Sequence, residues 1–274
     1  MTHVTRSWVG LGAVLCLVAC SDDGGSNTDA HTGPDQGAYD LARLEASVQD
    51  TGVNEAGETN EAGPQSCVGQ ILTGGEATNA RDLGGTPLAG GKRVTCGKIF
   101  RGGDLCSLTS TGCGEFASLG IKTVIDLRMA PVQQSDPAAA CVTSQASHVD
   151  AALPKLLPDT PANYLALLQE KAAVAKVFAA LGSAGSYPVY FHCVIGRDRA
   201  SFVAALILLA LGAERQAVIT EFELSNAAGV AVKTPCIEAL LDEINKLGGI
   251  ETYLTSAGVT AAQLATLRAE GRTP

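Results

Sequence analysis

A strand, a short loop and a helix follow one another between residues 187 and 212, and this run constrains the fold most. Residues 187–191 are aromatic and β-branched, which is typical of a buried strand. Residues 202–211 are all apolar, as in a core helix, and Gly212 follows as a stop. A loop that leads from a strand into a helix start gathers free backbone N–H groups, and the helix dipole adds positive potential there. The sequence therefore predicts an anion site at this junction.

The predicted loop carries a thiol and a guanidinium at a fixed spacing. Cys193 and Arg199 are separated by five residues. The thiolate is the reactive form of cysteine, and a helix N-terminus and a nearby guanidinium both stabilise it. The planar fork of Arg199 matches two phosphate oxygens, and Gly196 allows the loop to turn and its backbone to approach a ligand. We expect Cys193 to be a nucleophile and Arg199 a phosphate ligand.

The motif His-Cys-x5-Arg, which begins at His192, resembles the phosphate loop of the cysteine-dependent protein tyrosine phosphatase superfamily. The fuller form, His-Cys-x-x-Gly-Arg-Asp-Arg, resembles a bacterial tyrosine/dual-specificity branch whose loop usually reads His-Cys-x-x-Gly-Lys-Asp-Arg-Thr. The resemblance implies a three-layer α/β fold with a central, mostly parallel sheet of four to five strands flanked by helices. It also implies phosphomonoester hydrolysis through a cysteinyl-phosphate, with no cofactor and no metal.

Two earlier segments extend the resemblance to the same branch. Residues 79–85 read Asn-Ala-Arg-Asp-Leu-Gly-Gly, and residues 124–128 read Val-Ile-Asp-Leu-Arg. The resemblance places Arg101 near the substrate mouth, with a scaffold role as the alternative. It places Asp126 at the border of the site, where it would orient Arg199 or the loop, and a simple strand-end hydrogen bond is the alternative.

The resemblance implies a set of site residues. The catalytic residues would be Cys193, Arg199 and the general acid Asp198, and the substrate-binding residues would be His192, Val194, Ile195, Gly196, Arg197, Asp126 and Arg101. Other members of the superfamily use an aspartate on a separate upstream loop as the acid, so Asp159 and Asp150 are alternatives to Asp198.

Two residues of the loop depart from the usual pattern of the branch. Arg197 stands in place of lysine and keeps the charge. Ala200 stands in place of a serine or threonine whose hydroxyl helps the sulfur to leave, and Ser201 points elsewhere on the helix. We therefore expect slow breakdown of the phosphoenzyme and a modest turnover.

The first 66 residues predict export rather than a folded core. Residues 1–20 have a charged start, an apolar stretch and a small-residue end, which is typical of a secretory signal. The ending Leu-Val-Ala-Cys resembles a bacterial lipoprotein signal, which implies a lipid anchor on Cys20 and attachment to the cell envelope at the periplasmic face or outer membrane. Residues 21–66 hold ten acidic residues and one arginine, which predicts a disordered acidic tether.

Residues 67–274 are numerous enough for a single phosphatase domain with a good core. They hold 17 basic and 18 acidic residues, and this balance argues against nucleic-acid binding. Apart from Cys193 they contain six cysteines, which predicts up to three disulfides in an oxidising compartment. Cys106 and Cys113 are close enough in sequence to close a small loop. The absence of any Cys-x2-Cys pair and the scarcity of histidine argue against a metal site.

Three other functions stay open at the level of sequence. A phosphoinositide or inositol phosphate phosphatase would use the same loop, and the loss of a hydroxyl at Ala200 is compatible with a catalytically weak protein that binds phospho-ligands. A rhodanese-like sulfurtransferase also uses a cysteine on a cradle loop, but it has no need of Arg199. The expected partners are a phosphorylated protein or a small phosphomonoester. The sequence predicts neither the natural substrate nor the oligomeric state.

Overall fold

The computed structural model describes residues 67, 71–72 and 77–274, all within a compact unit that spans residues 62–274. The predicted signal at residues 1–20, the lipidated Cys20 and the tether at residues 21–66 lie outside the described residues. In the part of the chain that is described, no helix combines the length and the apolar character needed to cross a bilayer.

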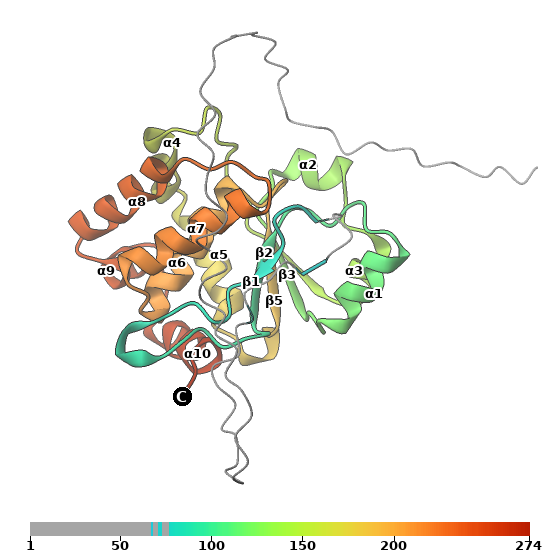
Figure 1. The fold of residues 1–274 in the computed structure, drawn as a ribbon, viewed down its shortest axis with the longest axis horizontal. Coiled ribbons are helices and arrows are strands. Elements are labelled where there is room, and N and C mark those ends of the chain that lie inside the picture. The colour runs from blue at the N-terminus through green and yellow to red at the C-terminus, as the bar shows by residue number, and fades with distance from the viewer. Residues whose placement is uncertain (1–66, 68–70, 73–76) are drawn as a thin grey trace, which may run out of the picture. The chain divides into compact units, whose positions relative to one another are not determined.

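A five-stranded sheet forms the centre of the unit (Figure 1). The strands, in spatial order, are β1 (Arg81–Asp82), β2 (Ile99–Gly102), β5 (Val189–His192), β3 (Thr123–Asp126) and β4 (Ser147–Asp150). Strands β2, β5, β3 and β4 run parallel to one another, and β1 pairs antiparallel with β2. The predicted mostly parallel sheet of four to five strands is confirmed.

Both faces of the sheet are covered, because successive side chains along each strand enter different cores. Phe100, Val124 and Tyr190 belong to the smaller core. That core also contains residues of α1 (Ser110–Ser118) and α3 (Ala140–Thr143), which lie together on one side of the sheet in Figure 1. The neighbouring residues Ile125 and Phe191 belong to the larger core. The architecture therefore has three layers.

The larger core lies under the remaining long helices, which occupy the opposite side of the sheet (Figure 1). These are α5 (Lys171–Leu181), α6 (Asp198–Leu211), α7 (Arg215–Ala227), α8 (Thr234–Lys246), α9 (Ile250–Ser256) and α10 (Ala261–Gly271). Helix α6 is buried along its whole length except at Asp198 and Leu209, and it ends at Gly212, which has a φ of 91°. The central helix is therefore apolar all round, as the sequence predicts.

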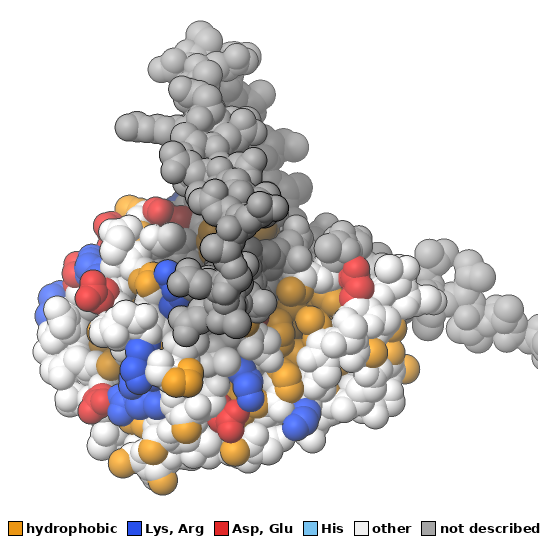
Figure 2. Space-filling view, turned by 60° about the horizontal axis from the view of Figure 1, so that its bottom comes forward, with side chains coloured by type: hydrophobic (Ala, Val, Ile, Leu, Met, Phe, Trp, Pro, Cys, Tyr) orange, Lys and Arg blue, Asp and Glu red, His pale blue; other side chains and the backbone are white. Residues whose placement is uncertain are grey.

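Short elements complete the chain. They are η3 (Ala89–Gly91), α2 (Ala130–Ser135), α4 (Pro161–Ala166), η4 (Leu167–Gln169) and η5 (Ala184–Ser186). Thr160 caps α4 by accepting a hydrogen bond from the amide of Asn163, and Pro161 follows at the first position of the helix. On the face shown in Figure 2, acidic and basic side chains of the described residues are interspersed.

Two disulfides are found among the described residues. Cys67 pairs with Cys96, and Cys113 pairs with Cys141. The predicted Cys106–Cys113 loop is therefore wrong, because Cys113 reaches across from α1 to α3 and joins two helices of the same layer. Cys236 is a free and buried thiol, so the six cysteines do not form three disulfides among themselves.

Candidate active site

The loop that carries Cys193 lies at the carboxyl edge of the parallel strands. It follows β5, which lies between β2 and β3, and it ends where α6 begins at Asp198. Ligands of open α/β sheets collect at this edge. Cys193 is a free thiol and is almost fully buried. Gly196 has a φ of 69°, and a Cβ there would lie 2.6 Å from the carbonyl carbon of Gly102, so only glycine fits this turn.

Two carbonyl groups of the loop are bound from outside it. The carbonyl of Val194 accepts a hydrogen bond from the amide of Asp104 at 2.9 Å. The carbonyl of Gly196 accepts from Nδ2 of Asn79 at 3.0 Å and from Nη2 of Arg101 at 2.6 Å. In a trans peptide the N–H points opposite to the C=O, so the next amides, those of Ile195 and Arg197, point away from these partners. The loop can therefore present N–H groups rather than carbonyls to an anion.

Arg199 lies in the first turn of α6 and is only 7% exposed. Its guanidinium makes no hydrogen bond or ion pair with any other described residue. None of its nitrogen atoms is among the buried side-chain atoms that lack a partner, so the guanidinium at the end of this largely buried side chain is open to solvent. A bound dianion such as a phosphate group would find this planar fork of donors free.

Asp198 has a fixed side chain beside the loop. Arg197 donates from Nε to Oδ1 at 3.0 Å and from Nη2 to Oδ2 at 3.2 Å. The hydroxyl of Tyr164, on α4, donates to Oδ1 at 3.2 Å. Burial and the charge of Asp198 raise the pKa of Tyr164 well above its usual value, so the phenol stays a donor. Tyr164 was not among the residues predicted from the sequence, because it lies 34 residues before Asp198 and meets it only in the fold.

The other two acid candidates have different surroundings. Oδ1 of Asp159 lies 2.9 Å from Nζ of Lys233, which joins the loop before α4 to the loop before α8. Partial burial raises the pKa of Asp159, but the Lys233 hydrogen bond and the charge of Arg197 outweigh it and hold this pKa below its usual value. Asp150 is exposed on the edge strand β4. The structure thus brings Asp159 into the electrostatic field of Arg197.

Asp126 binds Arg128 rather than Arg199. It accepts from Nε of Arg128 at 3.0 Å and from Nη2 at 2.7 Å, and its Oδ2 lies 3.8 Å from Nε2 of His192. The expected contact with Arg199 is not found among the described residues. His192 is fully buried, its Nδ1 lies 3.1 Å from the carbonyl of Cys193, and burial lowers its pKa below the usual value. Both residues thus support the strand ends under the loop.

Arg101 lies beneath the loop and is completely buried. Its Nη1 lies 2.9 Å from Oε2 of Glu221, and its Nη2 donates to the hydroxyl of Ser201 at 2.7 Å as well as to Gly196. Its position corrects the prediction that it contacts substrate at the mouth, because the guanidinium is used inside the protein. Glu221 was also missed, although a charged residue between the apolar Ile219 and Phe222 was a signal for a buried ion pair.

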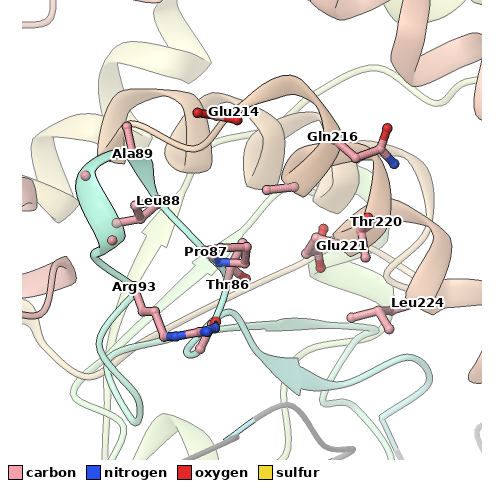
Figure 3. A pocket seen from close by; sticks show the side chains of 14 residues that line it. Thr86, Pro87, Leu88, Ala89, Arg93, Glu214, Gln216, Thr220, Glu221 and Leu224 are labelled. Carbon is pink, nitrogen blue, oxygen red and sulfur yellow. The ribbon is translucent and has the colours of Figure 1, made fainter. Parts of the chain in front are cut away.

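A cavity of about 610 Å³ lies elsewhere, between residues 85–93 and α7 (Figure 3). Figure 3 shows Thr86 and Pro87 on one side of it and Glu221 on the helix side. Neither Cys193 nor Arg199 lines this cavity. The Cys193 loop is therefore a separate feature, and Glu221, which lines the cavity, connects to that loop through Arg101.

Comparisons with known proteins agree with this geometry. The profile of the tyrosine phosphatase family matches residues 73–271. A protein of Cupriavidus necator named "Putative tyrosine-protein phosphatase" is 30% identical over 229 residues, which cover 68% of this chain and 84% of that protein. The core catalytic domain of a PP-IP phosphatase from S. cerevisiae, solved with citrate, has a TM-score of 0.36 and 11% identity over 57% of this chain and 89% of that one, and this likeness carries no weight. The family match spans almost the whole described unit and includes the Cys193 loop. The chain therefore belongs to the tyrosine phosphatase family.

Proposed function

We propose that the protein is a cysteine-dependent protein tyrosine or dual-specificity phosphatase, a hydrolase that works through a cysteinyl-phosphate. One observation carries the proposal: the guanidinium of Arg199 has no partner among the described residues and lies on the same strand–loop–helix unit as the free thiol of Cys193. A bound phosphate dianion would give the Arg199 guanidinium a charge partner and place a phosphorus atom next to the Cys193 sulfur.

The reaction would take two displacements at phosphorus. The thiolate of Cys193 attacks phosphorus as the bond to the ester oxygen breaks, and the electron pair stays on that oxygen. Asp198 gives the leaving oxygen its proton. A water molecule then attacks the cysteinyl-phosphate, Asp198 accepts a proton from it, and the thiolate departs as inorganic phosphate forms.

The loop would stabilise the charge on the three equatorial oxygens of the transferred group. Arg199 supplies a planar fork for two oxygens. The amides that follow the externally bound carbonyls of Val194 and Gly196 point to the side away from those partners, and α6 adds its positive end. These donors neutralise the phosphate without a cofactor.

Asp198 is our choice for the general acid. Its carboxylate is held by Arg197 and Tyr164 in one orientation at the start of α6. Asp159 is the alternative, although its pairing with Lys233 opposes protonation.

The decisive test is hydrolysis of p-nitrophenyl phosphate by the full-length protein in the presence of EDTA. We expect activity in the wild type and none in Cys193→Ser. Activity that persists in Cys193→Ser contradicts the proposal. Thiocyanate formation from thiosulfate would instead favour the sulfurtransferase, and tight orthovanadate binding without turnover would favour a phospho-ligand binding protein. Phosphotyrosine peptides, phosphoserine peptides and phosphoinositides then define the substrate.

We also propose that Cys20 carries a lipid that attaches the protein to a bacterial cell envelope. The Leu-Val-Ala-Cys sequence supports this, and the disulfides Cys67–Cys96 and Cys113–Cys141 suit an oxidising compartment. Labelling with a fatty-acid analogue in a bacterial host tests the proposal. Label in the wild type and none in Cys20→Ser is expected, and equal label in both contradicts it.

A further inference from the structure

We propose that Asn79 is a positioning residue for the reaction, and that it acts together with Arg101 by fixing the peptide between Gly196 and Arg197. Asn79 comes from the segment just before β1, far from the loop in sequence. The inference rests on the proposed function, because it concerns how the same loop binds an oxyanion.

The Gly196–Arg197 peptide needs such a restraint. Glycine populates positive and negative φ with similar ease, so a peptide next to glycine can turn over and exchange the directions of its C=O and N–H. Turned over, this peptide would present a carbonyl to the phosphate in place of the Arg197 amide. Two donors on the Gly196 carbonyl, at 3.0 Å from Asn79 and at 2.6 Å from Arg101, oppose that rotation.

Asn79 is itself held in one conformation. Its backbone has a φ of 59°, a left-handed value that asparagine tolerates better than most residues. Its Nδ2 also donates to the hydroxyl of Ser225 at 3.1 Å, and its Oδ1 accepts from Nη1 of Arg81. Asn79 is 1% exposed. Such over-determined backbone positions cluster at functional sites.

An ion-pair network connects the two donors. Glu221, on α7, lies 2.7 Å from Nη2 of Arg81 and 2.9 Å from Nη1 of Arg101. Arg81 holds the side-chain oxygen of Asn79, and Arg101 reaches Gly196 directly. Glu221 thus fixes Arg81, which holds Asn79, and it also fixes Arg101. Three elements therefore converge on a single peptide of the loop: α7, β2 and the segment that precedes β1.

Two substitutions isolate the role of the Asn79 amide. Asn79→Gly removes the side chain and keeps the positive φ free of strain. Asn79→Asp keeps the shape and the oxygen that faces Arg81, but it places an acceptor opposite the Gly196 carbonyl. Thr86→Val is the matched control, because it removes a buried hydrogen bond from the Thr86 hydroxyl to the carbonyl of Leu83, at 2.7 Å, without touching the loop.

Two measurements on the full-length protein report on the loop itself. One is the affinity for orthovanadate, and the other is the pH midpoint of Cys193 alkylation by iodoacetamide, followed by mass spectrometry so that Cys236 is counted separately. All variants are compared below their thermal unfolding midpoints. We expect both Asn79 variants to bind orthovanadate roughly tenfold more weakly, as expected for one misdirected donor to an anion, and their alkylation midpoints to rise.

The outcomes separate this inference from the proposed function. Orthovanadate affinity and alkylation midpoints equal to wild type in both Asn79 variants overturn the positioning role. Equal loss in Thr86→Val also overturns it, because the effect would then follow from general destabilisation. A wild-type protein that neither binds orthovanadate nor hydrolyses p-nitrophenyl phosphate would instead refute the phosphatase itself.

Discussion

The hydroxyl of Tyr164 donates a hydrogen bond to Oδ1 of Asp198 across 3.2 Å, and so connects α4 to the first residue of α6. Tyr164 is buried, and its ring packs edge-on against Phe222 with centroids 6.3 Å apart. The ring thus has a packing role and the hydroxyl a separate one, and a single substitution can separate them.

Tyr164→Phe removes the hydroxyl and keeps the ring. We expect little change in kcat/KM for p-nitrophenyl phosphate, whose leaving group needs little protonation, and a several-fold lower kcat/KM for phenyl phosphate, whose leaving group needs an oriented acid. The measurement is the ratio of the two kcat/KM values, because kcat/KM reports the step in which the leaving group departs. An unchanged ratio would mean that Arg197 alone orients Asp198.

The identity of the general acid is tested by three asparagine variants. Asp198→Asn should lower kcat for phenyl phosphate by about a hundredfold. Asp150→Asn, on an exposed edge strand, is the control and should match the wild type. If Asp159→Asn rather than Asp198→Asn shows the loss, Asp159 is the acid, and its ion pair with Lys233 must open during the reaction.

Glu221 gives the fold a defined pH dependence. Burial raises its pKa, but Arg101 and Arg81 outweigh burial and hold the pKa below its ordinary value of 4.5. The unfolded chain therefore binds more protons below pH 4.5, so this contribution to stability is complete above that pH and is lost as the pH falls further. We expect the free energy of unfolding, measured with urea, to fall steeply in this range.

Glu221→Gln should abolish that part of the pH dependence. It should also lower the stability at pH 7 by about 3–5 kcal/mol, because two buried guanidinium groups lose their carboxylate. Glu214→Gln, an exposed position at the start of the same helix, is the control and should behave as wild type. A variant at Glu221 with wild-type stability at pH 7 would contradict the network.

The sequence was sufficient for the parts of the fold that local patterns determine. The buried strand at Tyr190 and the apolar helix ended by Gly212 are found where the hydrophobic pattern placed them. Apolar residues recur at helical spacing over residues 162–181, which predicts one helix. The structure instead divides this stretch into α4, η4 and α5, with a break at Glu170, whose φ and ψ are not helical. An unbroken apolar spacing carries no information about such a break.

The site was predictable only where the residues are consecutive. The loop from His192 to Arg199 is one segment, so its spacing was visible. The supports come from four distant segments: Asn79, Arg101, Tyr164 and Glu221 meet only because the parallel order β2–β5–β3 and the packing of α7 bring them together. Disulfide pairing had the same limit, since short sequence separation favoured Cys106–Cys113 and the layer of α1 and α3 favours Cys113–Cys141.

Ala200 sets the expected rate-limiting step. It is fully buried in the larger core, and the hydroxyl of the next residue, Ser201, is already bound by Arg101 at 2.7 Å. Ala200 has no hydroxyl, and Arg101 holds the hydroxyl of Ser201 beneath the loop, so we expect neither residue to help the Cys193 sulfur leave. The wild type should release a burst of p-nitrophenol equal to the enzyme concentration and then turn over slowly. Ala200→Ser should abolish the burst and raise the steady-state rate, measured by stopped flow.

Ala204→Ser, one helical turn further along α6 and also buried, is the matched control and should keep the burst. A wild-type protein that shows no burst at a fast steady state would contradict slow breakdown of the phosphoenzyme.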